Sequence, residues 1–180
     1  MKFIFKKTPL QGLVVVQPEV GSDGRGTFSE RYKMSEFRKA GIKDVFVQEN
    51  LSVSRKGVLR GLHYQRAPHA QAKLVRCGHG RIFDVAADLR PGSKTFGRSF
   101  GLELSRENCL QLYIPAGFAH GFYALTDDAE VIYKCSKEYA PSHDAGVRWD
   151  DPDLAVKWPG RRHLLSPKDL ALPLLKDLKF

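Results

Sequence analysis

Residues 45–53 read Val-Phe-Val-Gln-Glu-Asn-Leu-Ser-Val, and their side chains alternate between an apolar and a mostly polar face of an extended chain. One face carries Val45, Val47, Leu51 and Val53, and the other carries Phe46, Gln48, Asn50 and Ser52. A period of two residues is typical of a β-strand, because successive side chains point to opposite sides of a sheet. The same period recurs in residues 81–89. Both stretches therefore predict strands.

Further short apolar stretches are bounded by Gly, Pro, Asn or Asp, which also predicts strands. They are residues 13–16, 58–64, 72–77, 100–104, 111–114, 120–125 and 130–137. Helices are expected to be few. Ser35 can cap a short helix ended by Gly41, and Ser166 can cap another that starts at Pro167 and stops at Pro173. Many strands with little helix predict an all-β barrel or jelly roll whose interior can hold a ligand.

The length of 180 residues suits one domain over residues 1–180. Apolar residues make up 42% and charged residues 27% of the chain, as in soluble globular proteins. No apolar run approaches the ~18 residues of a membrane helix, and no signal peptide is evident. We therefore expect a cytoplasmic protein without a membrane partner. Cys77, Cys109 and Cys135 are odd in number and widely spaced, which predicts reduced cysteines rather than a disulfide framework.

The net charge of +9 raises the question of a polyanion partner. Lys and Arg are scattered along the chain, however, and no RNA- or DNA-binding motif is present. We therefore expect no nucleic-acid partner. A smaller anion, such as a nucleotide or a diphosphate, fits the charge equally well.

Sequence signatures of common cofactors are absent. The chain has no G-x-x-x-x-G-K-[ST], no G-x-G-x-x-G after a strand and no H-E-x-x-H. A metal site in a β-barrel is expected to contain closely spaced histidines, as in H-x-H, but Gln65 follows His63 and Phe122 follows His120 at that spacing. We expect neither a metal nor another cofactor.

Polar side chains are dense in three predicted strand segments, residues 48–50, 60–65 and 130–134. Lys73 and His120 lie in two further strands. A barrel lined by His, Tyr, Lys and Arg can remove a proton from carbon, stabilise the negative charge and return a proton elsewhere, without any cofactor. This set of groups indicates an isomerase.

Several motifs resemble, in the same order, those of the dTDP-4-dehydrorhamnose 3,5-epimerase family. They are Gly57-Val58-Leu59-Arg60-Gly61-Leu62-His63-Tyr64-Gln65, Gln71-Ala72-Lys73-Leu74-Val75-Arg76-Cys77, Ile82-Phe83-Asp84-Val85, Ile114-Pro115-Ala116-Gly117-Phe118-Ala119-His120-Gly121-Phe122 and Leu165-Ser166-Pro167-Lys168-Asp169. The resemblance covers nearly the whole chain. It implies a cupin-type jelly roll (double-stranded β-helix), a homodimer, and cofactor-free epimerisation of a dTDP-4-keto-6-deoxyhexose at C3 and C5.

The resemblance also implies roles for individual residues. His63 would be the base, Asp169 its acidic partner, Lys73 the cation beside the enolate oxygen, and Tyr133 the proton donor on the opposite face. Contacts with the nucleotide sugar would come from Arg25, Glu30, Gln48, Glu49, Asn50, Arg60, Lys73, His120, Asp144 and Lys168.

One detail of a predicted strand and one of a predicted helix bear on these roles. Arg60 and His63 fall on opposite faces of an ideal strand, so Gly61 is expected to mark a bulge or bend. Asp169 also suits a helix-capping role after Ser166, and the two roles cannot easily share one carboxylate oxygen.

Three other functions remain open on the sequence. An epimerase acting at C3 or C5 alone, as in antibiotic-sugar pathways, would share the same motifs. A non-catalytic protein that binds a nucleotide sugar or a nucleic acid would also suit the basic charge. A metal-dependent cupin oxygenase is the third alternative, which the histidine spacing disfavours.

Overall fold

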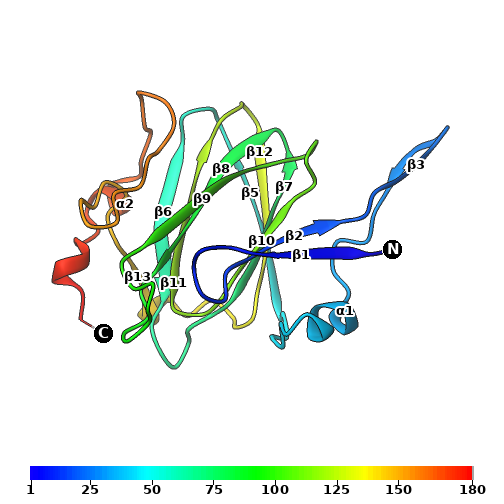
Figure 1. Ribbon diagram of the computed structural model, residues 1–180. Coiled ribbons are helices and arrows are strands. Elements are labelled where there is room, and N and C mark those ends of the chain that lie inside the picture. Colours follow the sequence, from blue (N-terminus) through cyan, green and yellow to red (C-terminus); the bar gives the residue numbers. More distant parts are fainter. Residues whose placement is uncertain (180) are drawn as a thin grey trace.

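The computed structural model describes residues 1–179 and consists mainly of two β-sheets that pack face to face (Figure 1). One sheet has the order β1 (Phe3–Lys7), β2 (Val14–Pro18), β10 (Gln111–Ile114), β7 (Lys73–His79), β12 (Ala129–Cys135) and β5 (Gln48–Ser54). The other has the order β13 (Asp144–Gly146), β6 (Leu59–Gln65), β11 (Phe118–Ala124), β8 (Arg81–Asp88) and β9 (Ser99–Ser105). Neighbouring strands in both sheets run antiparallel. The predicted all-β jelly roll of cupin type is confirmed.

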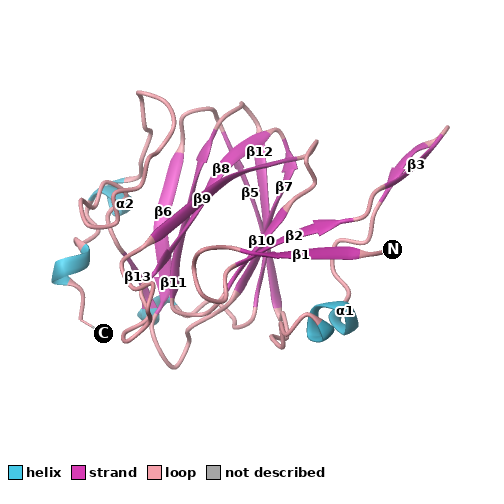
Figure 2. Cartoon of the chain, in the orientation of Figure 1, coloured by secondary structure: helices cyan, strands magenta, loops and turns pink. Residues whose placement is uncertain are grey.

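Helices are few and lie at the periphery (Figure 2). They are α1 (Met34–Lys39), α2 (Pro167–Leu170) and the 3₁₀ helices η1 (Pro141–His143) and η2 (Leu175–Asp177). The prediction that Ser35 caps α1 is wrong, because Lys33 occupies the N-cap and Ser35 lies inside the helix. Ser166 does cap α2, but this helix ends at Leu170, before Pro173.

The prediction of strands is correct for most segments but misses short ones. β1, β13 and the hairpin of β3 (Gly21–Asp23) and β4 (Gly26–Phe28) are not among the predicted strands. The predicted strand at residues 45–53 starts too early, since β5 begins at Gln48. The β3–β4 hairpin projects away from the two sheets (Figure 1). Residue 180, the end of the range predicted to form one domain, lies outside the described residues, and that prediction stays a prediction.

The main core lies between the sheets. Its buried side chains come from both of them: Val75, Cys77, Leu112, Ile114 and Val131 from the first sheet, and Ile82, Ala86, Leu104, Phe118 and Phe122 from the second. A second cluster covers the outer face of β8 and β11, where Val85, Ala87 and Ala119 pack against Leu154 and Leu175. The C-terminal segment is thus held against the second sheet, and it carries α2 with it.

The two faces of β5 do not follow the usual pattern of apolar side chains inside. Leu51 and Val53 are 58% and 52% exposed, and Val47, just before the strand, is 55% exposed. Gln48, Asn50 and Ser52 point the other way and are partly buried. Because polar side chains face the interior here, β5 helps to build a polar cavity rather than an apolar core.

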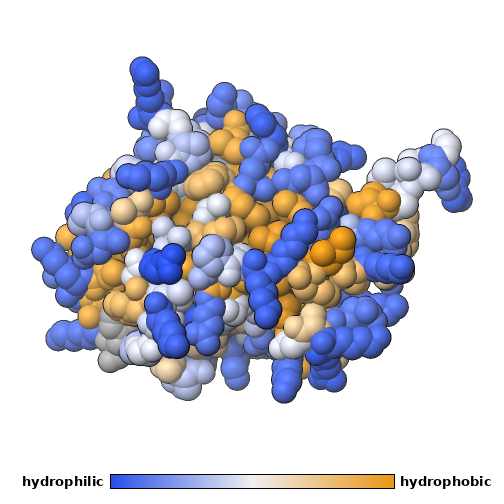
Figure 3. Space-filling view, in the orientation of Figure 1, coloured by the Kyte–Doolittle hydropathy of each residue, from blue (hydrophilic) through white to orange (hydrophobic). Residues whose placement is uncertain are grey.

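The surface seen in Figure 3 is mostly hydrophilic, with apolar residues showing between the hydrophilic ones. Within residues 1–179, no helix is both long enough and apolar enough to cross a membrane.

Candidate active site

A cavity of about 320 Å³ is lined by strands of both sheets and by α2. Its lining consists of Ser52, Arg60, His63, Lys73, His120, Gly121, Phe122, Tyr133, Ser166, Lys168 and Asp169. Seven of these residues were predicted to belong to the site, including all four with predicted catalytic roles. The fold therefore places the proposed base, its acidic partner, the cation and the phenol around one space.

A β-bulge turns Arg60 and His63 to the same cavity. Opposite β11, His63 pairs with His120 and Arg60 pairs with Phe122, so β6 has one extra residue between the two pairs. Gly61 has φ +116°, and a Cβ atom there would lie 2.6 Å from the Cα of Gly121. Only glycine suits both this backbone conformation and this close approach. The predicted bulge is confirmed.

His63 is held by a carboxylate in the cavity wall. Its Nε2 lies 2.6 Å from Oδ1 of Asp169. An ionised carboxylate can only accept, so Nε2 carries the hydrogen and Nδ1 is left with a lone pair. Asp169 uses its other oxygen, Oδ2, to accept a hydrogen bond from the Ser166 hydroxyl at 2.8 Å. The Ser166 oxygen also accepts the cap hydrogen bond from the backbone N–H of Asp169 at 3.1 Å. The contacts of the Asp169 carboxylate with Ser166 and with His63 use different oxygens, so the two roles of Asp169 coexist.

The charge of Asp169 is favoured by its neighbours. Burial by itself would raise the pKa of this carboxyl, but the hydrogen bonds from His63 and Ser166 outweigh burial and hold the pKa below its ordinary value of 3.8. Asp169 is therefore an anion at neutral pH. It can stabilise the positive charge that His63 gains on accepting a proton.

Lys73 and Tyr133 lie across the cavity on β7 and β12 of the other sheet. The Nζ of Lys73 is 5.8 Å from the centroid of the Tyr133 ring. Burial lowers the pKa of Lys73 and is its largest influence. Burial also raises the pKa of Tyr133 above its ordinary value of 10, although a hydrogen bond with Asn50 opposes this. The phenol is therefore protonated at neutral pH and can donate a proton.

His120 lies on β11 beside His63 and forms a second histidine–carboxylate pair. Its Nε2 is 2.8 Å from Oδ1 of Asp84, which lies on the neighbouring strand β8. Both residues are buried. Asp84 was not predicted as a site residue.

A row of polar side chains continues from the cavity. Lys168 bonds to Asp144, and Asp144 also accepts a hydrogen bond from the hydroxyl of Tyr139 at 3.1 Å. The backbone N–H of Tyr139 donates to Oε1 of Gln48, whose side-chain nitrogen donates to Asn50 at 3.0 Å. These contacts join four predicted site residues. Sequence reasoning missed Tyr139, the exposed aromatic residue at the centre of the row.

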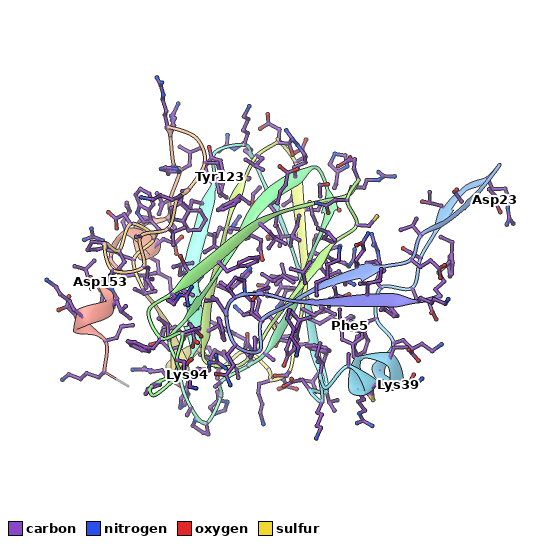
Figure 4. The ribbon with its side chains drawn as sticks, viewed as in Figure 1. Phe5, Asp23, Lys39, Lys94, Tyr123 and Asp153 are labelled. Carbon is purple, nitrogen blue, oxygen red and sulfur yellow. The ribbon has the colours of Figure 1, made fainter. Side chains whose placement is uncertain are left out.

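Three predicted site residues lie elsewhere. Glu49 faces the opposite side of β5 from Gln48 and forms an ion pair with Lys134 at 2.6 Å. Arg25 lies on the projecting hairpin and pairs with Asp23 at 2.7 Å, and Figure 4 places Asp23 well outside the two sheets. Glu30 follows the hairpin and lies 3.5 Å from the N-terminal amine. Within one chain, none of the three reaches the cavity.

Some of the missed lining residues could have been found from strand parity. Ser52 shares a face with Gln48 and Asn50, and Phe122 shares a face with His120. Ser166 was recognised as a helix cap but not as part of the cavity. Asp84 lies in one of the quoted motifs, but its contact with His120 and that of Tyr139 with Gln48 could not be inferred from spacing, because both join distant segments.

Among residues 1–179, no three or more His, Cys, Asp or Glu side chains are grouped so that they could hold a metal ion. The polar lining of the cavity instead comprises two histidines, each bonded to a carboxylate, together with Arg60, Lys73, Lys168, Tyr133 and two serines.

Comparison with known proteins agrees with this geometry. A family described as dTDP-4-dehydrorhamnose 3,5-epimerase matches residues 7–177. The enzyme of that name from Methanothermobacter thermautotrophicus is 50% identical over 158 residues, which is 88% of this chain and 85% of the relative.

Two solved structures are also similar. The dTDP-6-deoxy-D-glucose-3,5-epimerase from Legionella pneumophila, in complex with dTDP-4-keto-L-rhamnose, gives a TM-score of 0.95 at 44% identity, covering 99% of this chain and 95% of that one. A 3'-monoepimerase from Streptomyces bikiniensis in complex with dTDP-quinovose gives 0.88 at 38% identity, covering 94% and 86%. With its matching family, fold and cavity, the chain belongs to the dTDP-4-dehydrorhamnose 3,5-epimerase family.

Proposed function

We propose that this member of the family converts dTDP-4-dehydro-6-deoxy-D-glucose to dTDP-4-dehydro-L-rhamnose by inverting C3 and C5 in the cavity described above. The observation that carries the proposal is that one cavity holds His63, Lys73 and Tyr133, with His63 on one sheet and the other two on the opposite sheet. A base and a proton donor on opposite walls are what inversion at carbon requires.

The first step is removal of a proton from carbon beside the C4 ketone. Nδ1 of His63 has the free lone pair, because Nε2 is bonded to Asp169. The proton moves to Nδ1, and the electrons of the C–H bond delocalise onto the C4 oxygen as an enolate. The Asp169 carboxylate stabilises the resulting imidazolium.

Lys73 holds the negative charge of the enolate. Its ammonium has no carboxylate partner within 4.0 Å among residues 1–179, so it is available to the substrate. A fixed positive charge in a cavity shielded from water stabilises a developing oxyanion by about 3 to 4 kcal/mol.

Tyr133 completes the inversion. Its phenol gives a proton to the face of the carbon that His63 did not deprotonate, and the electrons of the enolate form the new C–H bond. If His63 returned its own proton to the same face, the starting configuration would be restored. The tyrosinate and the imidazolium regain their resting protonation by proton exchange with solvent.

The nucleotide part of the substrate is assigned to the polar row beside the cavity. Arg60 and Lys168 supply positive charge for the diphosphate, and a guanidinium suits it as a planar set of donors. Tyr139 is 55% exposed and is held between Gln48 and Asp144, so its ring offers a stacking surface for the base.

We further propose that the chain forms a homodimer in which Arg25 and Glu30 serve the partner's site. The hairpin that carries Arg25 projects from the sheets, and its Phe28 is 69% exposed. On the outer side of the edge strand β5, Leu51, Val53 and the preceding Val47 are apolar and exposed, beside the ion-paired Glu49. A second copy covering these surfaces would bury apolar area and bring the hairpin to another cavity.

A subunit-mixing experiment tests this arrangement. Inactive Arg25→Ala and His63→Ala proteins are unfolded together, refolded and assayed. If Arg25 acts in the partner's site, a mixed dimer has one site with both defects and one intact site, so activity returns. If Arg25 acts in its own site, every site keeps one defect and no activity returns. Sedimentation of the wild type as a monomer would contradict the dimer itself.

Proton NMR in deuterated water tests the reaction. Solvent deuterium entering both C3 and C5 of the sugar supports double epimerisation, whereas label at one carbon only supports a single-position epimerase like the Streptomyces bikiniensis protein. Tight binding without any exchange would reject the enzymatic function. The cytoplasmic location and the lack of a nucleic-acid partner stay predictions from the sequence.

A further inference from the structure

His120 of the cavity lining belongs to a histidine–carboxylate pair that the proposed proton transfers do not use. His120 pairs directly with His63 across β11 and β6, but its Nε2 turns to Asp84 on the other neighbouring strand, β8, at 2.8 Å. Asp84 is 0% exposed and His120 is 6% exposed. The proposed proton transfers thus leave a fully buried carboxylate, bonded to a residue of the cavity lining, without a function.

Asp84 depends on His120 for its hydrogen bonding. Among the described residues, its Oδ1 accepts from His120, and its Oδ2 is buried with no hydrogen-bond partner. A buried carboxylate without a donor is strongly unfavourable. If Nε2 of His120 lost its hydrogen, Asp84 would lose that one donor. The pair therefore fixes the hydrogen on Nε2.

The charge of His120 follows from its surroundings. Burial is the largest influence and lowers the pKa of His120; Asp84 raises the pKa, and Lys73 and His63 lower it again. The net direction is downward, so the ring is neutral at neutral pH. A neutral imidazole has one N–H, and here that hydrogen lies on Nε2. Nδ1 then has a lone pair and no hydrogen, so it can accept a hydrogen bond but cannot donate one.

We propose that Asp84 is a positioning residue that holds His120 as a hydrogen-bond acceptor for a hydroxyl group of the hexose, so that the cavity selects sugars with that hydroxyl. The inference rests on the proposed function, which supplies the sugar. The C4 ketone can only accept, and Lys73 is the donor available to it. The hydroxyl groups at C2 and C3 of a 4-keto-6-deoxyhexose are the remaining donors, and one of them meets Nδ1 of His120.

The tautomer is tested first, in the free protein. Nitrogen-15 NMR of histidine-labelled wild type reports which ring nitrogen carries hydrogen, and His120→Asn identifies the signals. We expect His120 to be protonated on Nε2 alone in the wild type, and Asp84→Asn to move part or all of the hydrogen to Nδ1. Wild-type His120 with hydrogen on Nδ1, alone or together with Nε2, would overturn the inference.

Selectivity is tested by binding, without any turnover. Calorimetry compares dTDP-6-deoxyglucose, which has no ketone to react, with its 2-fluoro and 3-fluoro analogues, in which a group that only accepts replaces the hydroxyl. At one of the two positions the wild type should lose about 10- to 100-fold in affinity, because two acceptors then face each other. In Asp84→Asn, where Nδ1 can donate, that loss should shrink at least tenfold. Equal affinity for all three ligands in the wild type would contradict the inference, as would an unchanged loss in the variant.

Asp151→Asn is the matched control. Asp151 is also buried, but it accepts from the backbone N–H groups of Asp153, Leu154 and Leu175 rather than from a cavity residue. This variant should keep both the His120 tautomer and the fluorine discrimination. If Asp84→Asn fails to fold, the wild-type spectrum still tests the tautomer of His120, and the wild-type affinities still test the selection of the hydroxyl group. Neither the spectrum nor the affinities depend on epimerisation. A wild type that exchanges deuterium but carries hydrogen on Nδ1 of His120 would therefore reject this inference and leave the proposed function standing.

Discussion

The substitution Asp169→Asn removes the negative charge beside the proposed base while preserving the shape of the side chain. Asp169 is 4% exposed, and its Oδ1 is 2.6 Å from Nε2 of His63. A hydrogen bond to a charged group contributes about 1.5 to 3 kcal/mol. If that stabilisation acts on the imidazolium formed during proton removal, its loss lowers kcat by about 10- to 150-fold, at 1.4 kcal/mol per factor of ten.

A second effect adds to this loss. The side-chain amide nitrogen that the substitution introduces can donate to Nε2 of His63, which drives the imidazole hydrogen onto Nδ1 and occupies the lone pair that acts as base. The Ser166 hydroxyl, which donates to Oδ2 of Asp169 in the wild type, can then donate to the amide oxygen instead. This orientation satisfies every polar group, so kcat is expected to fall by at least about 100-fold.

The assay combines the rate of deuterium exchange with the affinity for dTDP, which lies away from this pair. Asp177→Asn serves as a control, since Asp177 is an aspartate of the same C-terminal segment that lies in η2, outside the cavity lining. We expect Asp169→Asn to retain dTDP affinity and lose exchange, and Asp177→Asn to retain both. A kcat for Asp169→Asn within threefold of the wild type would refute the role given to Asp169.

Four further outcomes are expected. Lys73→Gln should lower kcat by about 100- to 1000-fold. Because burial lowers the pKa of Lys73 from 10.5, the wild type should lose activity on raising the pH before pH 10.5 is reached, as the ammonium loses its proton. Lys73→Arg, if it is active, should lack this alkaline loss. Tyr133→Phe should still exchange deuterium, since removal and return of a proton by the base remain possible, but NMR should show little inverted product. Gly61→Ala should destabilise the fold by about 3 kcal/mol in urea unfolding, since its Cβ would meet the backbone of Gly121 at 2.6 Å, and equal stability would contradict the bulge. Burial would raise the pKa of Asp88, but its hydrogen bonds lower the pKa from 3.8 to about 2. The ionised carboxylate therefore adds about 2 kcal/mol to the free energy of unfolding above pH 4, and this stabilisation is lost as the pH falls towards 2. Asp88→Asn should be less stable than the wild type by that amount at pH 7, and the difference should disappear in acid.

Local patterns were enough to predict much of the fold and part of the site. Alternation along β5 placed Gln48 and Asn50 on one face, and both face the interior. The conflict in parity between Arg60 and His63 predicted the bulge at Gly61. In both cases the information lies within a few consecutive residues, so the sequence contains it.

The ends of strands were harder to predict, because they depend on the partner strand. Residues 45–47 continue the alternation of β5, yet pairing with β12 ends where Gln48 meets Cys135. The pattern gives the direction of side chains but does not tell where a neighbour ends. It also does not tell which side is interior, and the apolar side of β5 lies outward.

Contacts between residues that are far apart in the chain could not be predicted from the sequence. Asp84 meets His120 because β8 and β11 are neighbours in the sheet, although 36 positions separate the two residues. Tyr139 meets Gln48 from 91 positions away. No pattern of spacing indicates such pairs, since they follow from the assembled jelly roll.

The most direct test of the mechanism is a crystal structure of the His63→Asn variant with the 4-keto substrate bound. We expect the hexose ring to lie between residue 63 and the Tyr133 hydroxyl, with C3 or C5 about 3 to 3.5 Å from each of them on opposite faces of the ring. The Nζ of Lys73 should contact the C4 oxygen. A hexose bound outside this cavity, or both groups on the same face of the ring, would refute the proposed mechanism.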